Sequence, residues 1–206
     1  MNIVIVTSVV HTKEQSIFPP SERLQQLSNT IDSIHQHIPH PFIVVLEGSE
    51  TEVYNSSIKS LQIDEFHHNI NIHNYPKSHG EILLLFHYFE SPAFQKLKSS
   101  PTQFLTINKI SGRYYFAPCF TFDTTHLSKI RVHNTWSGKG ITETRYYRFP
   151  FQYCDEFMHK LSQIIQQGIY IDLEHTFYQI QVIPHGSIDE IHIKGIEAPT
   201  GKEIYD

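Results

Sequence analysis

The sequence predicts an α/β fold, in which a mostly parallel central sheet is flanked by helices. Three short apolar runs, residues 3–6, 42–46 and 104–107, are typical of strands that are buried on both faces. Segments with helical periodicity lie between these runs, and a polar loop follows each of them. Strands that alternate with helices in this way form parallel sheets, so we expect the runs to belong to one such sheet.

The other elements follow from local patterns along the chain. Apolar residues at helical spacing predict a first helix, with Ser21 as its N-cap and its end near Pro39. Residues 82–89 predict a buried helix, followed by helix-compatible sequence up to Lys98. We further expect a weak helix at 52–61, an ambiguous stretch at 63–72, a fourth strand at 146–149, an amphipathic helix at 155–167 with Ile165 on its apolar face, a short helix at 172–180 and a last strand at 188–193.

Composition limits the class of protein. The 206 residues suit a single domain, 1–206, and 39% hydrophobic with 18% charged residues is a globular balance. The net charge of −5 provides no basic field to attract nucleic acid. No apolar run approaches the roughly 20 residues of a membrane span, no leader pattern opens the chain, and two cysteines suit a reducing compartment. We therefore expect a soluble, cytoplasmic protein with no nucleic-acid partner and no integral membrane segment.

The polar loops after the three buried runs are the expected place for a binding site. In open α/β sheets a ligand binds at the carboxyl ends of the strands, where the strand order reverses. Candidate binding groups are Thr7 and Ser8 after the first run, Glu47 after the second and residues 108–116 after the third.

Two cations, Lys109 and Arg113, flank Ser111 and Gly112 in the third of these segments. Glycine allows backbone amides to approach a ligand, and arginine offers a planar fork that suits phosphate. Each charge-assisted hydrogen bond contributes about 1.5–3 kcal/mol. The segment is therefore either a phosphate-binding loop or a plain turn with solvated basic residues.

Four further residues are candidates for binding the same ligand. Gly80 and Glu81, in the segment that begins at Lys77, could bring backbone amides and a carboxylate near ligand hydroxyls. Alternatively, Glu81 only complements the helix dipole. Arg23 lies in the first turn of a predicted helix, where a cation is unfavourable, so an anionic partner and a solvated side chain are both open.

The run KISGRYYF, residues 109–116, resembles the K-x-S-G-R-Y signature of a group of glycosyltransferase-like proteins from large viruses and microbes. Three other segments agree with that group in order and rough spacing: SERLQQLSNTIDSIHQHIP leading to IVVLEGS, KSHGEILLL, and DLEHTFY followed by GIEAPTG. These short motifs together span nearly the whole chain. The resemblance implies a GT-A-like, Rossmann-like fold that binds a nucleotide sugar at the strand ends and transfers the sugar to a glycan or sugar acceptor.

One departure from ordinary GT-A enzymes concerns the metal. Those enzymes typically carry an Asp-x-Asp motif after the central strand to hold a divalent metal on the diphosphate, and this sequence contains no Asp-x-Asp. Lys109 and Arg113 occupy the matching place, where cations can neutralise a leaving diphosphate. We therefore expect transfer without a bound metal and no cofactor besides the nucleotide-sugar substrate, with a divalent metal as the open alternative.

The acceptor side of the site is expected near the C-terminus. Glu174 and His175 could deprotonate an acceptor hydroxyl, although a general base needs hydrogen-bond reach. The alternative is that they only form a helix surface or cap. Glu197 is a second choice, and Asp123 and Asp172 also stay open.

Two other functions stay open beside glycosyl transfer. A nucleotidyltransferase has a similar sheet but normally carries a glycine-rich loop after the first strand, and TSVVHTKEQS lacks glycine. A catalytically inactive nucleotide- or glycan-binding module would also lack Asp-x-Asp. The absence of G-x-G-x-x-G and G-x-x-x-x-G-K argues against dinucleotide oxidoreductases and P-loop NTPases. Scattered histidines, without cysteine nearby, argue against a structural zinc site.

Overall fold

The computed structural model describes residues 1–10, 17–49, 56–68, 72, 75, 77–100, 103–123, 129–134, 140–168, 172–182, 191–197 and 200–205. Within them the strands are β1 (Asn2–Ser8), β2 (Pro41–Glu47), β3 (Glu65–His67), β4 (Thr106–Ser111), β5 (Tyr114–Phe116), β6 (Lys129–Asn134), β7 (Gly140–Pro150), β8 (Ile193–Ile196) and β9 (Glu203–Tyr205). The helices are α1 (Pro20–His37), α2 (Ser56–Lys59), α3 (Lys77–Glu90), α4 (Pro92–Lys98), α5 (Cys154–Gln167) and α6 (Leu173–Ile180), with a 3₁₀ turn at Phe151–Tyr153.

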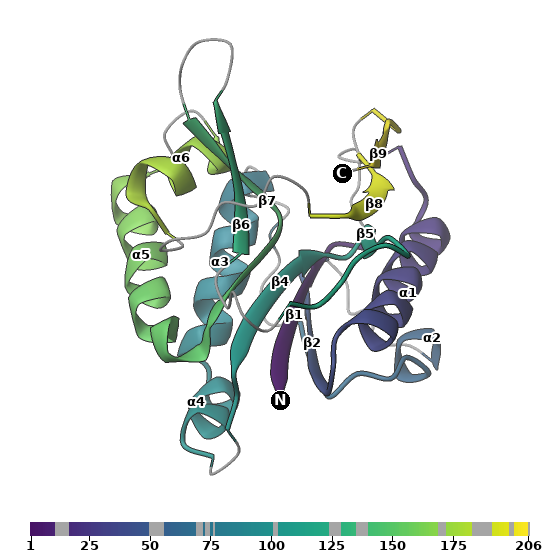
Figure 1. Ribbon diagram of the computed structural model, residues 1–206, viewed down its shortest axis with the longest axis horizontal. Helices are drawn as coiled ribbons and strands as arrows, with labels where there is room; N and C mark the ends of the chain where they lie inside the picture. The colour runs from purple at the N-terminus through teal and green to yellow at the C-terminus, as the bar shows by residue number, and fades with distance from the viewer. Residues whose placement is uncertain are drawn as a thin grey trace.

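The main sheet has the strand order β3-β2-β1-β4-β7-β6 (Figure 1). The pairs β1–β2, β1–β4 and β2–β3 are parallel, whereas β7 runs antiparallel to both β4 and β6. Only β7 is therefore reversed within this sheet, which confirms the predicted α/β fold with a mostly parallel sheet. The chain places β2 and β3 on one side of β1 and then returns with β4 on the other side. The boundary between β1 and β4 is thus a topological switch point.

Helices cover both faces of this sheet, which is why its central strands are apolar on both sides (Figure 1). Alternate residues of β1 belong to different cores. Val4 and Val6 lie in the cluster that α1 closes, and Ile3 and Ile5 lie in the cluster that α3 and α5 close.

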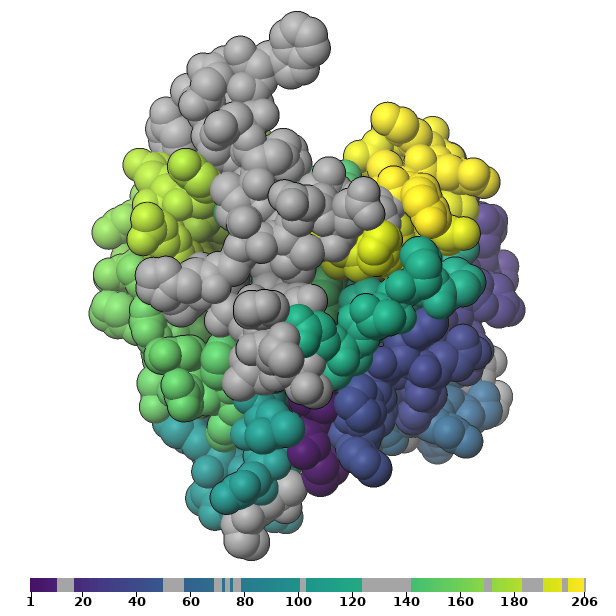
Figure 2. Space-filling model, viewed as in Figure 1, coloured from purple at the N-terminus to yellow at the C-terminus, as the bar shows by residue number. Residues whose placement is uncertain are grey.

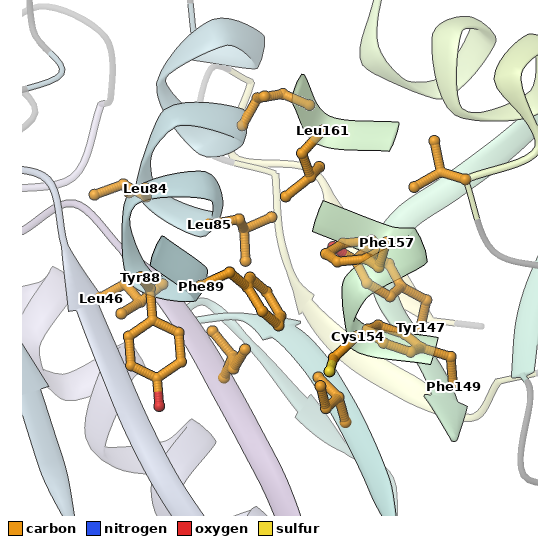
Figure 3. Close-up of a cluster of buried hydrophobic side chains, with 14 of the residues drawn as sticks. Leu46, Leu84, Leu85, Tyr88, Phe89, Tyr147, Phe149, Cys154, Phe157 and Leu161 are labelled. Atoms are coloured by element: carbon orange, nitrogen blue, oxygen red, sulfur yellow. The ribbon is translucent and has the colours of Figure 1, made fainter. Parts of the chain in front are cut away.

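The helix expected at residues 82–89 is confirmed as α3, which packs against the sheet and alongside α5. Figure 3 shows Leu85 and Phe89 of α3 among the side chains that face α5. The ring of Phe157 lies 5.4 Å from that of Phe89 and 4.6 Å from that of Phe149, measured between centroids. The helix-compatible sequence that follows forms the separate helix α4, in which the Ser91 side chain accepts a hydrogen bond from the Phe94 amide.

Several predicted boundaries are wrong. The N-cap of α1 is Pro19, and Ser21 lies inside the helix, because Pro20 takes the first helical position, where its missing N–H is not needed. The third strand begins at Thr106 and continues to Ser111, because its whole length pairs with β1. Ile165 is 40% exposed and does not join the buried face of α5.

The C-terminal strand prediction is also shifted. The last strands are β8 and β9, while residues 188–190, the start of the strand predicted at 188–193, lie outside the described part. Of the weak helix expected at 52–61, the described residues contain α2, and residues 52–55 lie outside the described part. Strand β3 falls in the stretch at 63–72 that the sequence left ambiguous. The pattern did not predict β5, β6 or β9, since strands of this kind depend on distant partners.

A second sheet with the order β5-β8-β9 lies beside α1. Both of its strand pairs are antiparallel. Gly195 is required at its centre, because a Cβ atom there would lie 2.4 Å from the Arg113 carbonyl oxygen and 2.4 Å from Cδ1 of Tyr114. The main sheet's turn at Arg113 is therefore held against the C-terminal part of the chain.

Among the helices of the described residues, none combines the length and the apolar character that crossing a membrane requires.

Candidate functional site

The carboxyl ends of β1, β2 and β4 meet at one edge of the sheet, as the sequence predicts. Thr7 pairs with Ser111 across the switch point and with Leu46 on the other side. The Gly112 amide donates to the Thr7 carbonyl at 2.8 Å, and the Gly48 amide donates to the Ser8 carbonyl at 2.9 Å. We call these strand ends, with the side chains that contact them, the strand-end site.

Lys109 lies within β4 and is only 1% exposed. Its ammonium group lies 2.5 Å from Oε1 of Glu81 and donates to Oγ of Ser111 at 2.9 Å and to the Thr144 carbonyl at 2.7 Å. Burial lowers the pKa of Lys109, Glu81 opposes this shift, and Arg113 adds to it. Lys109 thus ties β4 to α3 and β7 beneath the surface of the site, through its ion pair with Glu81 and its hydrogen bonds to Ser111 and Thr144.

Glu174 belongs to the same polar cluster. Its Oε1 accepts a hydrogen bond from Oγ1 of Thr144 at 2.9 Å, and its charge raises the pKa of Lys109. The hydroxyl of Tyr147 is also buried there, where burial and the charge of Glu81 raise its pKa. Among the described residues this hydroxyl has no hydrogen-bond partner. The cluster therefore places a carboxylate from α6 close to the end of β4.

Arg113 follows β4 in the turn and differs from Lys109 in its surroundings. Its guanidinium lies 5.1 Å above the ring of Tyr114, and no carboxylate within the described ranges forms an ion pair with it. Its Nε is buried and likewise lacks a partner there. Arg113 lowers the pKa of both Arg23 and Lys109, so the three cations are electrostatically coupled at the strand ends.

Arg23 is explained by the fold itself. The side chain is 4% exposed, and its Nε and Nη2 donate to the Val9 carbonyl at 3.3 and 3.2 Å. The pKa of Arg23 is lowered to about 10, first by burial and then by the charge of Arg113, while the charge of Glu47 opposes the shift. The unfavourable position at the start of α1 is thus offset by the loop after β1 and by the charge of Glu47.

Glu47 is fully buried at the end of β2. Its Oε1 accepts hydrogen bonds from the Val10 amide at 2.9 Å, the Ser49 amide at 3.0 Å and the Ser49 hydroxyl. Its Oε2 has no hydrogen-bond partner in the part of the chain that the structure describes. Glu47 therefore holds the loops after β1 and β2 together.

Gly80 and Lys77 are placed in the first turn of α3. Gly80 is needed for packing, because a Cβ atom there would lie 2.7 Å from Cδ1 of Ile72. Lys77 begins the helix, and its side chain lies outside the described part.

The remaining predicted residues lie in caps and turns. The amide and Nδ1 of His175 are both 2.8 Å from Oδ1 of Asp172, so His175 turns to the N-cap of α6. Glu197 lies in the turn after β8, where its Oε2 accepts from the Thr200 hydroxyl at 2.7 Å. Asp123 accepts a hydrogen bond from Arg148 through its backbone carbonyl.

The N-cap of α6, the helix that carries Glu174, leads to a first prediction about stability. Replacing Asp172 with alanine removes the acceptor of the His175 amide and should lower the free energy of unfolding by about 1 kcal/mol. Urea unfolding measures this loss. Asp172→Asn keeps a cap oxygen and serves as the control. An asparagine variant as unstable as the alanine variant would contradict the capping role.

Two members of the site, Thr144 and Tyr147, are not among the site residues predicted from the sequence. Both enter it because β7 pairs antiparallel with β4 and brings Tyr147 opposite Lys109. Neither residue type is distinctive of ligand binding on its own.

The strand ends do not suit a resident divalent metal. Three cations, Arg23, Lys109 and Arg113, lie among the carboxylates there, and Glu81 is already paired with Lys109. Across the described ranges no three His, Cys, Asp or Glu side chains converge on one point. We therefore derive no reaction step through a metal.

A scan of the sequence against models of known protein families and a search of curated proteins found no match.

Proposed function

We propose that the protein is a glycosyltransferase that binds a nucleotide sugar at the strand-end site and transfers the sugar to a glycan or sugar acceptor. The observation that carries this proposal is Arg113, a cation without an ion-pair partner among the described residues, located at the switch point of the sheet. Ligands of doubly wound sheets bind at this point, and a guanidinium suits a diphosphate. The resemblance of KISGRYYF to glycosyltransferase-like proteins supports the same assignment.

In this proposal Arg113 contacts the diphosphate directly, and Lys109 acts through its neighbours. The ammonium group of Lys109 is already engaged inside the protein, since it forms an ion pair with Glu81 and donates hydrogen bonds to Ser111 and Thr144. The proposed role of Lys109 is to hold α3, β4 and β7 together beneath the site. A preorganised cation stabilises charge on a leaving diphosphate without reorganisation during the reaction.

Glu174 is the proposed general base. Thr144 fixes one of its carboxylate oxygens, which leaves the other oxygen to accept the proton of the acceptor hydroxyl. The acceptor oxygen then bonds to the anomeric carbon, and the bond from that carbon to the diphosphate oxygen breaks. The diphosphate leaves with its new negative charge beside Arg113, and the proton stays on Glu174. Glu174→Gln should keep nucleotide-sugar binding and lose turnover.

The two cysteines, exposed Cys119 and buried Cys154, are both free. Free thiols suit a reducing compartment, so we place the proposed reaction in the cytoplasm.

Thermal unfolding in the presence of UDP-, GDP-, CMP- and dTDP-sugars tests the donor site. A ligand that binds only the folded protein adds about 2.7 kcal/mol of stability at a hundredfold excess over its Kd. We expect one nucleotide class to raise Tm and the free sugars to leave it unchanged. If no nucleotide sugar raises Tm, the proposed function is wrong.

A turnover assay with the stabilising donor then separates an enzyme from an inactive binding module. Hydrolysis or transfer should be measurable and should persist in the presence of a chelator. Loss of turnover with the chelator and recovery with manganese would contradict metal-independent transfer.

A further inference from the structure

A pocket of about 530 Å³ lies between α1, the turn at Arg113 and the second sheet. Figure 2 shows the C-terminal strands, in yellow, against the green-teal segment that contains β5, with α1 in purple-blue beside them. The volume is within the range of sites that bind small molecules. The strand-end site and this pocket share Arg113 as a common wall.

One face of the second sheet lines this pocket with a cation between two aromatic rings. Lys194 pairs with Tyr115 on one neighbouring strand and with Tyr205 on the other, so the three side chains lie side by side. The ammonium of Lys194 lies 4.8 Å above the ring of Tyr205. Both rings are exposed, Tyr115 at 36% and Tyr205 at 66%. Such a face can stack on a small ring while the ammonium contacts an anionic substituent.

The opposite wall, on α1, also offers hydrogen-bond donors. Oε1 of Gln26 accepts from Nη1 of Arg23 at 2.7 Å, which turns the NH₂ group of Gln26 the other way. Within the described residues, that NH₂ group has no partner. Oδ1 of Asn29 accepts from Gln25 at 3.0 Å. Because both amide oxygens are engaged inside the protein, the groups left for a ligand are donors.

The charges of the pocket favour an anion that also carries hydroxyl groups. Arg113 and Lys194 face one carboxylate, Glu203, which leaves the lining with a net positive charge. Glu203 itself can accept hydrogen bonds from hydroxyls. Donors on three sides and one acceptor match a sugar that bears a phosphate or carboxylate.

We propose that this pocket binds a small hydroxylated anion, such as a sugar phosphate or a sugar carboxylate, separately from the diphosphate of the donor. Binding at this pocket does not depend on the proposed function.

Calorimetric titration with glucose 6-phosphate, glucuronate and glucose tests this assignment. We expect the two anions to bind and glucose to bind at least about tenfold more weakly, because it lacks the charge-assisted contacts. Lys194→Ala should weaken glucose 6-phosphate binding by about tenfold or more, which is the lower bound for one such contact. Asn29→Ala, at an exposed site on α1, provides a second variant with little risk to folding.

Lys202→Ala is the matched control, because it removes the same charge from the turn before β9 without altering the lining. An equal effect of Lys202→Ala and Lys194→Ala would overturn the proposal, as would equal binding of glucose and glucose 6-phosphate or no binding of either anion. Displacement of glucose 6-phosphate by a nucleotide sugar would merge the two sites and overturn their separation. If no nucleotide sugar binds, the proposed function fails. The titration with glucose 6-phosphate and glucuronate then still shows whether the pocket binds a small hydroxylated anion.

Discussion

Replacing Glu81 with alanine should lower the free energy of unfolding by about 3–5 kcal/mol, the loss expected when one partner of a buried ion pair is removed. Lys109 is 1% exposed and faces Glu81 at 2.5 Å. Without that carboxylate, a charge in the interior keeps only neutral oxygen partners, those of Ser111 and Thr144. Equilibrium unfolding in urea or guanidinium chloride measures the change.

The pH dependence of this variant provides an independent check. Burial already lowers the pKa of Lys109 below its ordinary value of 10.5, and Glu81 opposes that shift. In Glu81→Ala the folded protein should therefore release the proton more readily than the unfolded chain does. Where the unfolded state binds more protons, stability rises with pH. The deficit should accordingly shrink as the pH rises toward 10.5, because the ammonium becomes neutral in the folded variant before it does in the unfolded chain.

Lys98→Ala is the control for Glu81→Ala. It removes an ion pair with Asp155 in which the two side chains are 35% and 64% exposed. Exposed ion pairs contribute about 0–1 kcal/mol, so Lys98→Ala should lower the free energy of unfolding only slightly. The change does not involve Lys109. A Glu81→Ala variant as stable as Lys98→Ala would show that the buried pair does not hold the site together.

Replacing Arg113 with alanine should weaken binding of the nucleotide sugar by about a hundredfold, which corresponds to about 3 kcal/mol. The guanidinium can donate two parallel hydrogen bonds to the diphosphate, and alanine removes both. Stability should change little, because within the described part of the chain Arg113 forms no ion pair. Calorimetric titration with the donor that raises Tm most measures the Kd.

Arg145→Ala is the matched control for Arg113→Ala. Its guanidinium lies 5.9 Å from the ring of the same Tyr114, but it pairs with Glu143 at 2.8 Å. Removing it deletes a similar charge nearby without removing the proposed diphosphate contact. Arg113→Lys should recover part of the affinity, since lysine keeps the charge but not the planar fork. Equal losses in Arg145→Ala and Arg113→Ala would contradict a direct contact.

The elements that the sequence predicts well are those defined by neighbouring residues. Strands β1 and β2 are predicted by the apolar runs at 3–6 and 42–46, and helices α1 and α5 by the helical spacing of their apolar residues. In each case the pattern is contained within one short segment of the sequence. The meeting of Thr7, Ser8, Glu47 and Ser111 at one edge follows from the parallel order of those strands.

The depth of Lys109 could not be predicted in the same way. Asn108, Lys109 and Ser111 look like a loop because polar residues are rare in central strands. They are in fact strand residues whose polar groups find partners far along the chain. Asn108 donates to the Ile3 carbonyl and accepts from the Tyr146 hydroxyl, and Lys109 depends on helix α3. Such partners are brought together by the tertiary fold, so they cannot be predicted from a local sequence pattern.

The hydrogen bond from the Gly112 amide to the Thr7 carbonyl affects how a ligand can be recognised. It extends the ladder between β1 and β4 by one rung past the end of the strand, where a Cβ atom at Gly112 would lie 3.2 Å from Cδ1 of Leu27 and 3.3 Å from the Thr7 carbonyl oxygen. The two strands therefore do not diverge to leave an open crevice, and that backbone amide is not available to a ligand. Recognition must come from side chains that project beyond the paired ends of β1 and β4. Substitutions of those side chains can change ligand preference without disturbing the sheet beneath.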